Sequence, residues 1–168
     1  MIKTLVRTGL TLGFLLCSGE VGQARELLGR AGLGYNAQFS NADRNGQTPA
    51  MSLKYAFAPR SALEVVTGFY SGAGGNGVVA LKYCRTIRSE NYVNFYFPLG
   101  LGYLTSRGTS GIEVLGGLGA EFFIPGVDSV GMSFEAGLSG ESISSGTGTF
   151  VLKTFGASFL NAGMHYYF

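Results

Sequence analysis

Histidine and cysteine are nearly absent from this sequence, and charged residues are scarce. His165 is the only histidine, and of the two cysteines Cys17 lies in the expected leader, which leaves Cys84 alone in the mature chain. One histidine and one cysteine are too few for a zinc site, and a single cysteine excludes a disulfide within the mature chain. Charged residues make up only 13% of the sequence, about half the share in an average soluble protein. The net charge of +2 indicates no polyanionic partner such as a nucleic acid.

Long apolar segments are also lacking. Beyond the first 24 residues there is no run of 18 apolar residues, which excludes a helical membrane protein. The mean hydropathy is nevertheless positive, and 28 of the 168 residues are glycine, well above the usual share. A chain that is apolar, poor in charge and rich in glycine, yet without transmembrane helices, fits a membrane β-barrel better than a soluble domain.

Residues 1–24 have the pattern of a secretory signal peptide, which leaves residues 25–168 as the mature domain. The pattern consists of a positive start, a short apolar stretch and a small-x-small cleavage site, provided by Lys3 and Arg7, by Leu10 to Leu16, and by Gly22-Gln23-Ala24. The apolar stretch is too short for an anchor helix that spans a membrane.

The mature chain divides into eight segments in which apolar residues alternate with small or polar ones, and this period of two predicts β-strands. We expect strands at about residues 30–40, 50–58, 62–70, 78–87, 92–104, 112–124 and 130–139, and in a final segment that ends at Phe168. Two places do not fit. Pro98 lies inside the fifth segment and predicts a bulge or kink. Residues 150–159 alternate out of step with the end of the chain, which leaves the register there open.

Eight alternating strands fit two architectures with opposite faces. A soluble barrel or sandwich places the apolar face inside, whereas a membrane barrel places it outside. Here the mixed face is mostly Gly, Ala, Ser and Asn with about one charge per strand, fewer than a solvated face carries. Small residues suit the narrow interior of an eight-stranded barrel. The links after the first, third, fifth and seventh strands tend to be longer than the others, an asymmetry that places both termini of outer-membrane barrels in the periplasm.

The last nine residues alternate strictly, with Leu160, Ala162, Met164, Tyr166 and Phe168 on one face. This closing strand and its terminal phenylalanine resemble those of outer-membrane β-barrel proteins. The mature chain as a whole resembles the small eight-stranded members, such as the OmpA transmembrane domain, OmpX and OmpW. The resemblance implies an all-β fold: an eight-stranded antiparallel transmembrane β-barrel with up-and-down meander order, closed between its first and last strands.

The same resemblance implies a location in the outer membrane of a Gram-negative bacterium. The expected partners are outer-membrane lipid and lipopolysaccharide, together with the barrel-assembly machinery, which would read the C-terminal strand from Leu160 to Phe168. We expect a monomer that needs no cofactor or metal.

On this register six charged side chains point into the interior of the barrel. They are Arg30, Lys54, Glu64, Lys82, Glu121 and Glu135. Glu113 has the same parity, but it lies near the loop end of its strand and is left out of the set. Because an unpaired charge is costly in such a space, we expect ion pairs that plug the interior rather than a track for ions. Side chains leave little room in a barrel of eight strands.

The expected function is therefore that of a structural or interaction protein of the outer membrane with a plugged interior. One alternative is a narrow pore or a conduit for small hydrophobic molecules, and a second is a secreted soluble β-barrel that binds a lipid-like ligand. No catalytic residue is expected. Some eight-stranded barrels act on lipid A with a histidine and a serine at the outer-leaflet end, whereas His165 lies near the periplasmic end and the sequence indicates no nucleophile beside it. We expect His165 to bond to a glutamate or tyrosine in the interior.

Overall fold

The structure, a computed structural model, describes residues 27–36, 50–71, 75–106, 108–144, 149–154 and 161–168. The expected signal peptide lies outside these residues. The described part consists of β-strands: β1 (Ala31–Asn36), β2 (Ala50–Ala58), β3 (Ser61–Tyr70), β4 (Asn76–Glu90), β5 (Val93–Ser106), β6 (Thr109–Ile124), β7 (Val127–Ser144), β8 (Thr149–Thr154) and β9 (Asn161–Tyr167). Within these ranges no helix is long and apolar enough to cross a membrane.

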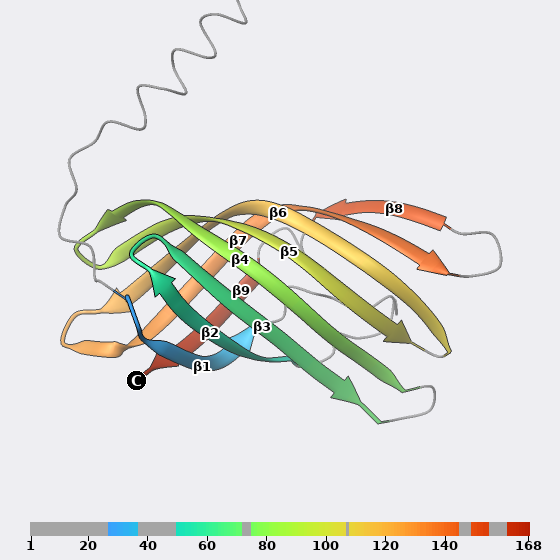
Figure 1. The fold of residues 1–168 in the computed structure, drawn as a ribbon, viewed down its shortest axis with the longest axis horizontal. Helices are drawn as coiled ribbons and strands as arrows, with labels where there is room; N and C mark the ends of the chain where they lie inside the picture. The colour runs from blue at the N-terminus through green and yellow to red at the C-terminus, as the bar shows by residue number, and fades with distance from the viewer. Residues whose placement is uncertain (1–26, 37–49, 72–74, 107, 145–148, 155–160) are drawn as a thin grey trace, which may run out of the picture.

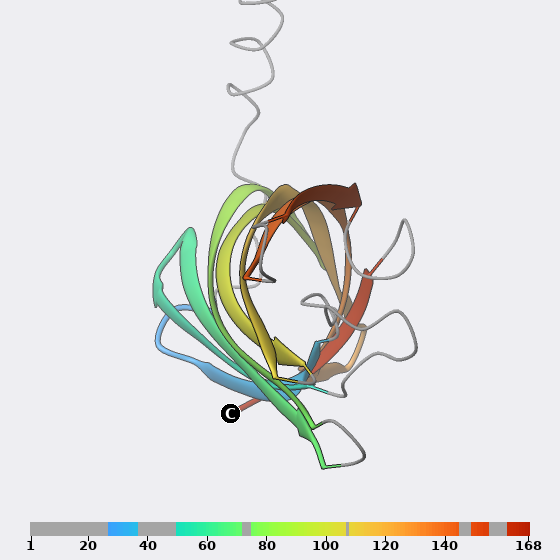
Figure 2. The same cartoon turned by 90° about the vertical axis from the view of Figure 1, so that its right-hand side faces the viewer.

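The strands form a closed antiparallel barrel (Figures 1 and 2). Each strand from β1 to β7 pairs with the next one along the chain, and β9 pairs with β7 on one side and β1 on the other. β8 pairs with the far end of β7, so β8 and β9 together take the place of the eighth strand. The predicted fold class, an eight-stranded meander closed by its first and last strands, is therefore confirmed.

The break between β8 and β9 accounts for the segment whose register could not be predicted. Leu138 of β7 faces Thr154 of β8, and Glu135 of β7 faces Asn161 of β9. The partners lie three positions apart on β7 but seven apart on the last segment, so the last segment contains four extra residues. Because side chains alternate with a period of two, an insertion of four residues preserves the alternation. β8 and β9 therefore both direct their odd-numbered side chains inward. Residues 155–159 lie outside the described residues.

At Pro98, where a bulge or kink was predicted, neither ladder shows a register shift. Pro98 faces Cys84 of β4 in unbroken register, while the ladder to β6 is interrupted at Phe97 and Pro98. An interruption at proline is expected because its nitrogen has no hydrogen to donate. The shift lies instead in the neighbouring strand β4, at Ile87, where the pairing to β5 slips by one residue.

The two ends of the barrel differ less than the sequence suggests. At one end, where β1 begins and β9 ends, the links between strands are tight: Pro59-Arg60, Asn91-Tyr92 and Pro125-Gly126. At the other end, only residues 107 and 108 separate β5 from β6, so the longer link predicted between the fifth strand (residues 92–104) and the sixth (residues 112–124) is wrong. The positive φ of 78° at Gly108 and of 84° at Gly126 suits such short turns. β7 also continues to Ser144, well past its predicted end at residue 139.

The distribution of polarity is the reverse of that in a soluble protein. Large apolar side chains point outward around the whole barrel, and central examples such as Leu53, Leu101 and Leu138 are 48%, 57% and 55% exposed. The lysines and glutamates of the strand interiors point inward, and most are buried, among them Lys82, whose exposed fraction is 0%, whereas Arg85 of β4 is exposed. The alternation read from the sequence therefore predicts correctly which face of each strand is apolar.

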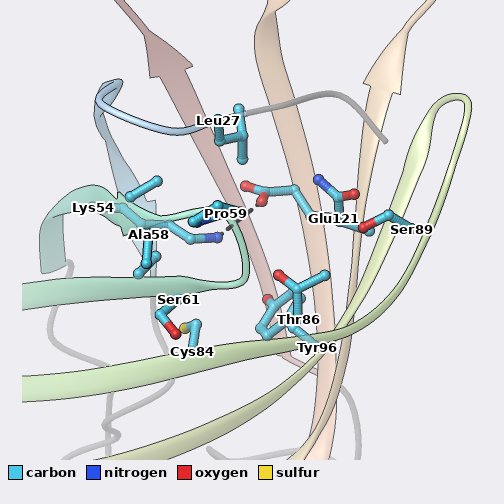
Figure 3. A pocket seen from close by; sticks show the side chains of 13 residues that line it. Leu27, Lys54, Ala58, Pro59, Ser61, Cys84, Thr86, Ser89, Tyr96 and Glu121 are labelled. Carbon is cyan, nitrogen blue, oxygen red and sulfur yellow. Dashed lines mark hydrogen bonds and ion pairs between the residues drawn. The ribbon is translucent and has the colours of Figure 1, made fainter. Parts of the chain in front are cut away.

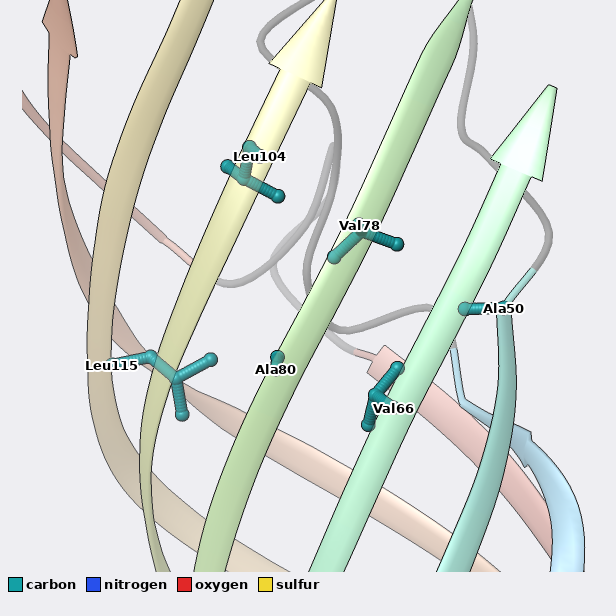
Figure 4. Packing of buried hydrophobic residues seen from close by; sticks show 6 residues of the cluster. All are labelled: Ala50, Val66, Val78, Ala80, Leu104 and Leu115. Atoms are coloured by element: carbon teal, nitrogen blue, oxygen red, sulfur yellow. The ribbon is translucent and has the colours of Figure 1, made fainter. Parts of the chain in front are cut away.

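Apolar side chains fill one level of the interior (Figure 4). They form a cluster from β2 to β6 that consists of Ala50, Val66, Val78, Ala80, Leu104 and Leu115. Along β4 the inward side chains run Cys84, Lys82, Ala80 and Val78, starting from the tight-turn end. The apolar cluster thus lies beyond the charged level when the barrel is entered from the tight turns.

Candidate functional site: the interior network

Five of the six charged residues predicted to face the interior lie there together. They are Lys54 of β2, Glu64 of β3, Lys82 of β4, Glu121 of β6 and Glu135 of β7. Lys54 is the most exposed of them, at 4%. Strands from all around the barrel therefore contribute to one buried group of charges, which we call the central network.

Arg30 does not belong to the central network. Its guanidinium lies at the tight-turn rim, where it donates hydrogen bonds to the backbone oxygens of Tyr167 at 3.2 Å and Asp128 at 3.3 Å. The reason is that β1 begins only at Ala31. Arg30 precedes the strand, so the alternation that directs side chains inward does not apply to it.

Lys54 and Glu121 form the first half of the central network. The Lys54 ammonium lies 2.9 Å from Oε2 of Glu121, and the Tyr167 hydroxyl donates to Oε1 of the same carboxylate at 2.5 Å. The Tyr167 ring lies across the backbone of Gly32, its partner on β1, where an added Cβ would approach the ring to 2.7 Å. Glycine at position 32 thus makes room for the tyrosine that holds Glu121.

The second half repeats this arrangement with different strands. The Lys82 ammonium lies 2.9 Å from Glu135, whose carboxylate also accepts a hydrogen bond of 2.5 Å from the Tyr96 hydroxyl. The Tyr96 ring covers Gly119, where a Cβ would come within 2.5 Å of it. The Lys54 ammonium lies 4.9 Å from the centre of the Tyr96 ring, which joins the two halves.

Glu64 is the third carboxylate of the central network. It lies 2.8 Å from the Lys82 ammonium, which it shares with Glu135, and accepts a hydrogen bond of 2.9 Å from Nδ2 of Asn36. Nε2 of His165 lies 3.5 Å away. The interior position expected for His165, beside a glutamate, is thus what the structure has. Each of the three carboxylates has a lysine and at least one neutral donor, as buried charges require.

Ser52 is a neighbour of His165 that the sequence analysis did not identify. Its Oγ lies 2.7 Å from Nε2 of His165, and both residues are only 1% exposed. In a catalytic triad the acid bonds to the other ring nitrogen and orients the base. Here Glu64 approaches the same Nε2, and Nδ1 has no hydrogen-bond partner. The arrangement therefore lacks the geometry of a triad. Ser52 could have been found from its parity, which it shares with Lys54.

A cavity of about 30 Å³ lies at the tight-turn end of the interior (Figure 3). The Lys54–Glu121 pair forms part of its lining, together with Cys84, Tyr96 and Asn94. This volume holds about one or two water molecules. The cavity is therefore a small vestibule beside the central network.

A second group of charges lies inside the barrel near the ends of β6, β7 and β8. The Lys153 ammonium is 2.8 Å from Oε2 of Glu141 and 3.6 Å from Oε1 of Glu113, and both glutamates are buried. Glu113 was not predicted to belong to the interior set, and Glu141 lies beyond the predicted end of the seventh strand at residue 139. Lys153 lies in the segment whose register was open. All three residues have odd numbers, which places them on the inward face of their strands. The length of β7 brings Glu141 and the paired strand β8 to the level of Glu113.

Among the described residues no group of three or more His, Cys, Asp and Glu side chains is arranged to hold a metal ion. Comparisons of the chain with protein families, with curated proteins and with solved structures found no match.

Proposed function

We propose that this chain is an integral β-barrel protein of a bacterial outer membrane, with a structural or interaction role and an interior plugged by ion pairs. The observation that carries the proposal is the reversed polarity of the barrel. Apolar side chains cover the outside of every strand interior, while lysines and glutamates lie within. Only a surrounding apolar phase makes that arrangement favourable.

The extent of the apolar surface supports this environment. Soluble monomers rarely expose a contiguous apolar patch of more than about 300–600 Å². Here outward leucines such as Leu53, Leu81, Leu101, Leu118 and Leu138 continue the apolar surface from β2 through β7. Strands β2 to β7 each have nine or more residues, enough for a tilted strand to cross a bilayer, which takes about 9–11.

Aromatic side chains lie toward both ends of this apolar surface. Tyr55, Phe57 and Phe122 point outward near the tight turns, and Phe69 and Tyr103 point outward toward the other end. Aromatic girdles of this kind lie at the two interfaces of outer-membrane barrels. We therefore place the tight turns and both ends of the mature chain in the periplasm, with lipopolysaccharide around the other end and phospholipid around the tight turns.

The packed interior favours a plug over the alternative of a pore or conduit. The central network occupies one level, the apolar cluster around Leu104 and Leu115 occupies another, and the cavity beside Lys54 has only about 30 Å³. Pockets for small-molecule ligands typically have about 300–1,000 Å³. The small cavity volume also weighs against the second alternative, a soluble barrel that binds a lipid-like ligand. Such a barrel would in addition need its apolar face inside. The proposal accordingly includes no catalytic activity and no cofactor.

The proposed route of assembly uses the C-terminal strand. Of the segment from Leu160 to Phe168, residues 161–168 are described, and Met164, Tyr166 and Phe168 point outward on β9 and at its end. β9 closes the barrel against β1. We propose that the barrel-assembly machinery reads this strand before closure and that the finished barrel is a monomer.

Cell fractionation followed by SDS gels of boiled and unboiled samples tests the proposal. We expect the protein in the outer-membrane fraction, with a band whose mobility changes on boiling because the barrel stays folded until it is heated. A soluble periplasmic protein with no change in mobility would refute the membrane location. Planar-bilayer recordings then distinguish a plug from a pore, since a plugged barrel gives no steady conductance.

A further inference from the structure

The group formed by Glu113, Glu141 and Lys153 is not explained by the plug. Glu113 and Glu141 face each other directly across the β6–β7 ladder. Side chains in such positions lie about 5 Å apart at Cβ, and like charges placed there are destabilising. Their exposed fractions are 0% and 3%, so bulk water does not screen them. A folded barrel that keeps this pair needs positive charge between the two carboxylates.

The positive charge beside Glu113 and Glu141 does not neutralise both carboxylates. Lys153 is the one ammonium paired with these carboxylates in the described part of the chain, so two negative charges face a single positive one. Both oxygens of Glu113 and Oε1 of Glu141 have no hydrogen-bond partner. The central network differs, because there every carboxylate has neutral donors in addition to lysine.

Ser139 is an independent sign that a ligand is missing. Its side chain is 2% exposed and lies beside the Glu113 carboxylate. No well-aligned hydrogen bond joins the two, and Oγ of Ser139 has no other partner. A buried hydroxyl and three carboxylate oxygens that accept no hydrogen bond therefore lie together with one excess negative charge among the described residues.

We propose that Glu113, Glu141 and Ser139 form an exchangeable site for a hard divalent cation of the Ca²⁺ class, with Lys153 as the resident counter-ion that the cation displaces. Carboxylate and hydroxyl oxygens are the donors that such cations prefer, and water completes their coordination. The Lys153 side chain is 22% exposed, so its ammonium can move toward solvent on its long stem. Once it has moved, two positive charges neutralise two negative ones.

The site depends on the fold alone and not on the membrane location, so failure of one proposal leaves the other testable. The probe is Ca²⁺ added to folded, chelator-treated protein in a non-ionic detergent, with binding measured by calorimetry and unfolding followed by the heat-dependent gel shift. We expect saturable binding of one Ca²⁺ and an unfolding temperature that rises with Ca²⁺ concentration, because a ligand of the folded state stabilises it.

Three variants distinguish a cation site from a merely structural cluster. Glu113→Gln should abolish Ca²⁺ binding and also raise the unfolding temperature of the metal-free barrel, because it removes the excess buried charge. Lys153→Met should strengthen Ca²⁺ binding by at least about tenfold, because it removes the competing ammonium. Glu90→Gln, which changes an exposed carboxylate at the opposite rim, is the matched control and should alter neither quantity.

Two results would overturn the proposal. One is the absence of saturable Ca²⁺ binding to wild type and to Lys153→Met, combined with a metal-free Glu113→Gln barrel that is no more stable than wild type; a proton on Glu113 would then satisfy the cluster. The other is binding that survives both Glu113→Gln and Glu141→Gln, which would place the cation elsewhere, for example at the exposed rim.

Discussion

Tyr96 and Tyr167 show how single residues make a charged interior tenable. Each ring lies close over a cross-strand glycine, and each hydroxyl donates to a glutamate that is also paired with a lysine. The glycine supplies room, the tyrosine fills it with apolar surface, and the hydroxyl satisfies one carboxylate oxygen. The high glycine content of the sequence thus has a specific use at positions 32 and 119.

Removing one partner of a buried ion pair should be much more costly than removing one at the surface. We expect Lys54→Met to lower the free energy of unfolding by about 3–5 kcal/mol, because Glu121 is left buried without its cation. Urea unfolding in lipid vesicles measures this. Arg88→Met is the control, since its pair with Glu90 is exposed, and it should cost less than about 1 kcal/mol. The double variant Lys54→Met with Glu121→Gln should recover part of the loss, and no difference between Lys54→Met and Arg88→Met would contradict the network.

The glycine under Tyr96 gives a second test at this scale. Gly119→Ala places a Cβ within 2.5 Å of the Tyr96 ring, which its bond to Glu135 holds in position, so we expect a loss of about 1–3 kcal/mol. Gly116→Ala lies on the same strand and meets its nearest neighbour at 3.7 Å, an ordinary contact. It should leave the free energy of unfolding unchanged or slightly raised. Equal effects of the two substitutions would show that Tyr96 does not cover Gly119 as described.

Strands are the scale at which the two faces of the barrel are decided. The period of two directs alternate side chains to the outer surface and to the interior, and a one-residue shift would exchange the faces. The described strands depart from regular pairing at Ala56/Ala58, Thr86/Arg88 and Phe123/Ile124, all near the tight turns, and again between β8 and β9. The slip at Ile87 in β4 lies close to the tight turn, and the four extra residues before β9 are even in number, so both parts of the last segment keep the same faces.

Substitutions on the outward face should depend on depth along the strand. Leu101, midway along β5, is 57% exposed and would meet the bilayer centre, so Leu101→Arg should destabilise the inserted barrel by about 2–4 kcal/mol. Val127 also points outward but lies beside the turn at Pro125-Gly126, so Val127→Arg should cost about 0–1 kcal/mol. Unfolding from lipid vesicles gives both values. If both arginines were tolerated equally, the outer surface would not face lipid.

At the scale of the whole molecule, the proposed plug consists of two successive levels, the central network and the apolar cluster. We expect the double variant Lys54→Ala with Glu121→Ala to enlarge the cavity at the tight-turn end without steady conductance in planar bilayers, because Leu104 and Leu115 still close the interior. Adding Leu104→Ala and Leu115→Ala should produce conductance. A wild-type barrel that conducts steadily would exclude the plug, and a double variant that conducts would mean that the ion pairs are the only seal.

Local pattern determined the number of strands, their order and the face on which each side chain lies. Neighbouring strands joined by short turns form a meander, and alternation is a property of each strand by itself, so Lys54, Glu64, Lys82, Glu121 and Glu135 could be assigned to the interior before any contact was known. The assignment was wrong for Arg30, because alternation says nothing about a residue that precedes its strand.

The tertiary structure decided which charges meet across the barrel, whereas Glu64 and Lys82 are direct partners on the β3–β4 ladder. Lys54 pairs with Glu121 and Lys82 with Glu135, each across the barrel rather than along a ladder, and such contacts depend on the stagger between strands, which no single strand encodes. Glu113 and Glu141 differ, because they face each other on the β6–β7 ladder, but only the length of β7 and the position of β8 bring Lys153 to them. Sequence fixes a side chain's face through local geometry, whereas its partners follow from how the sheet closes.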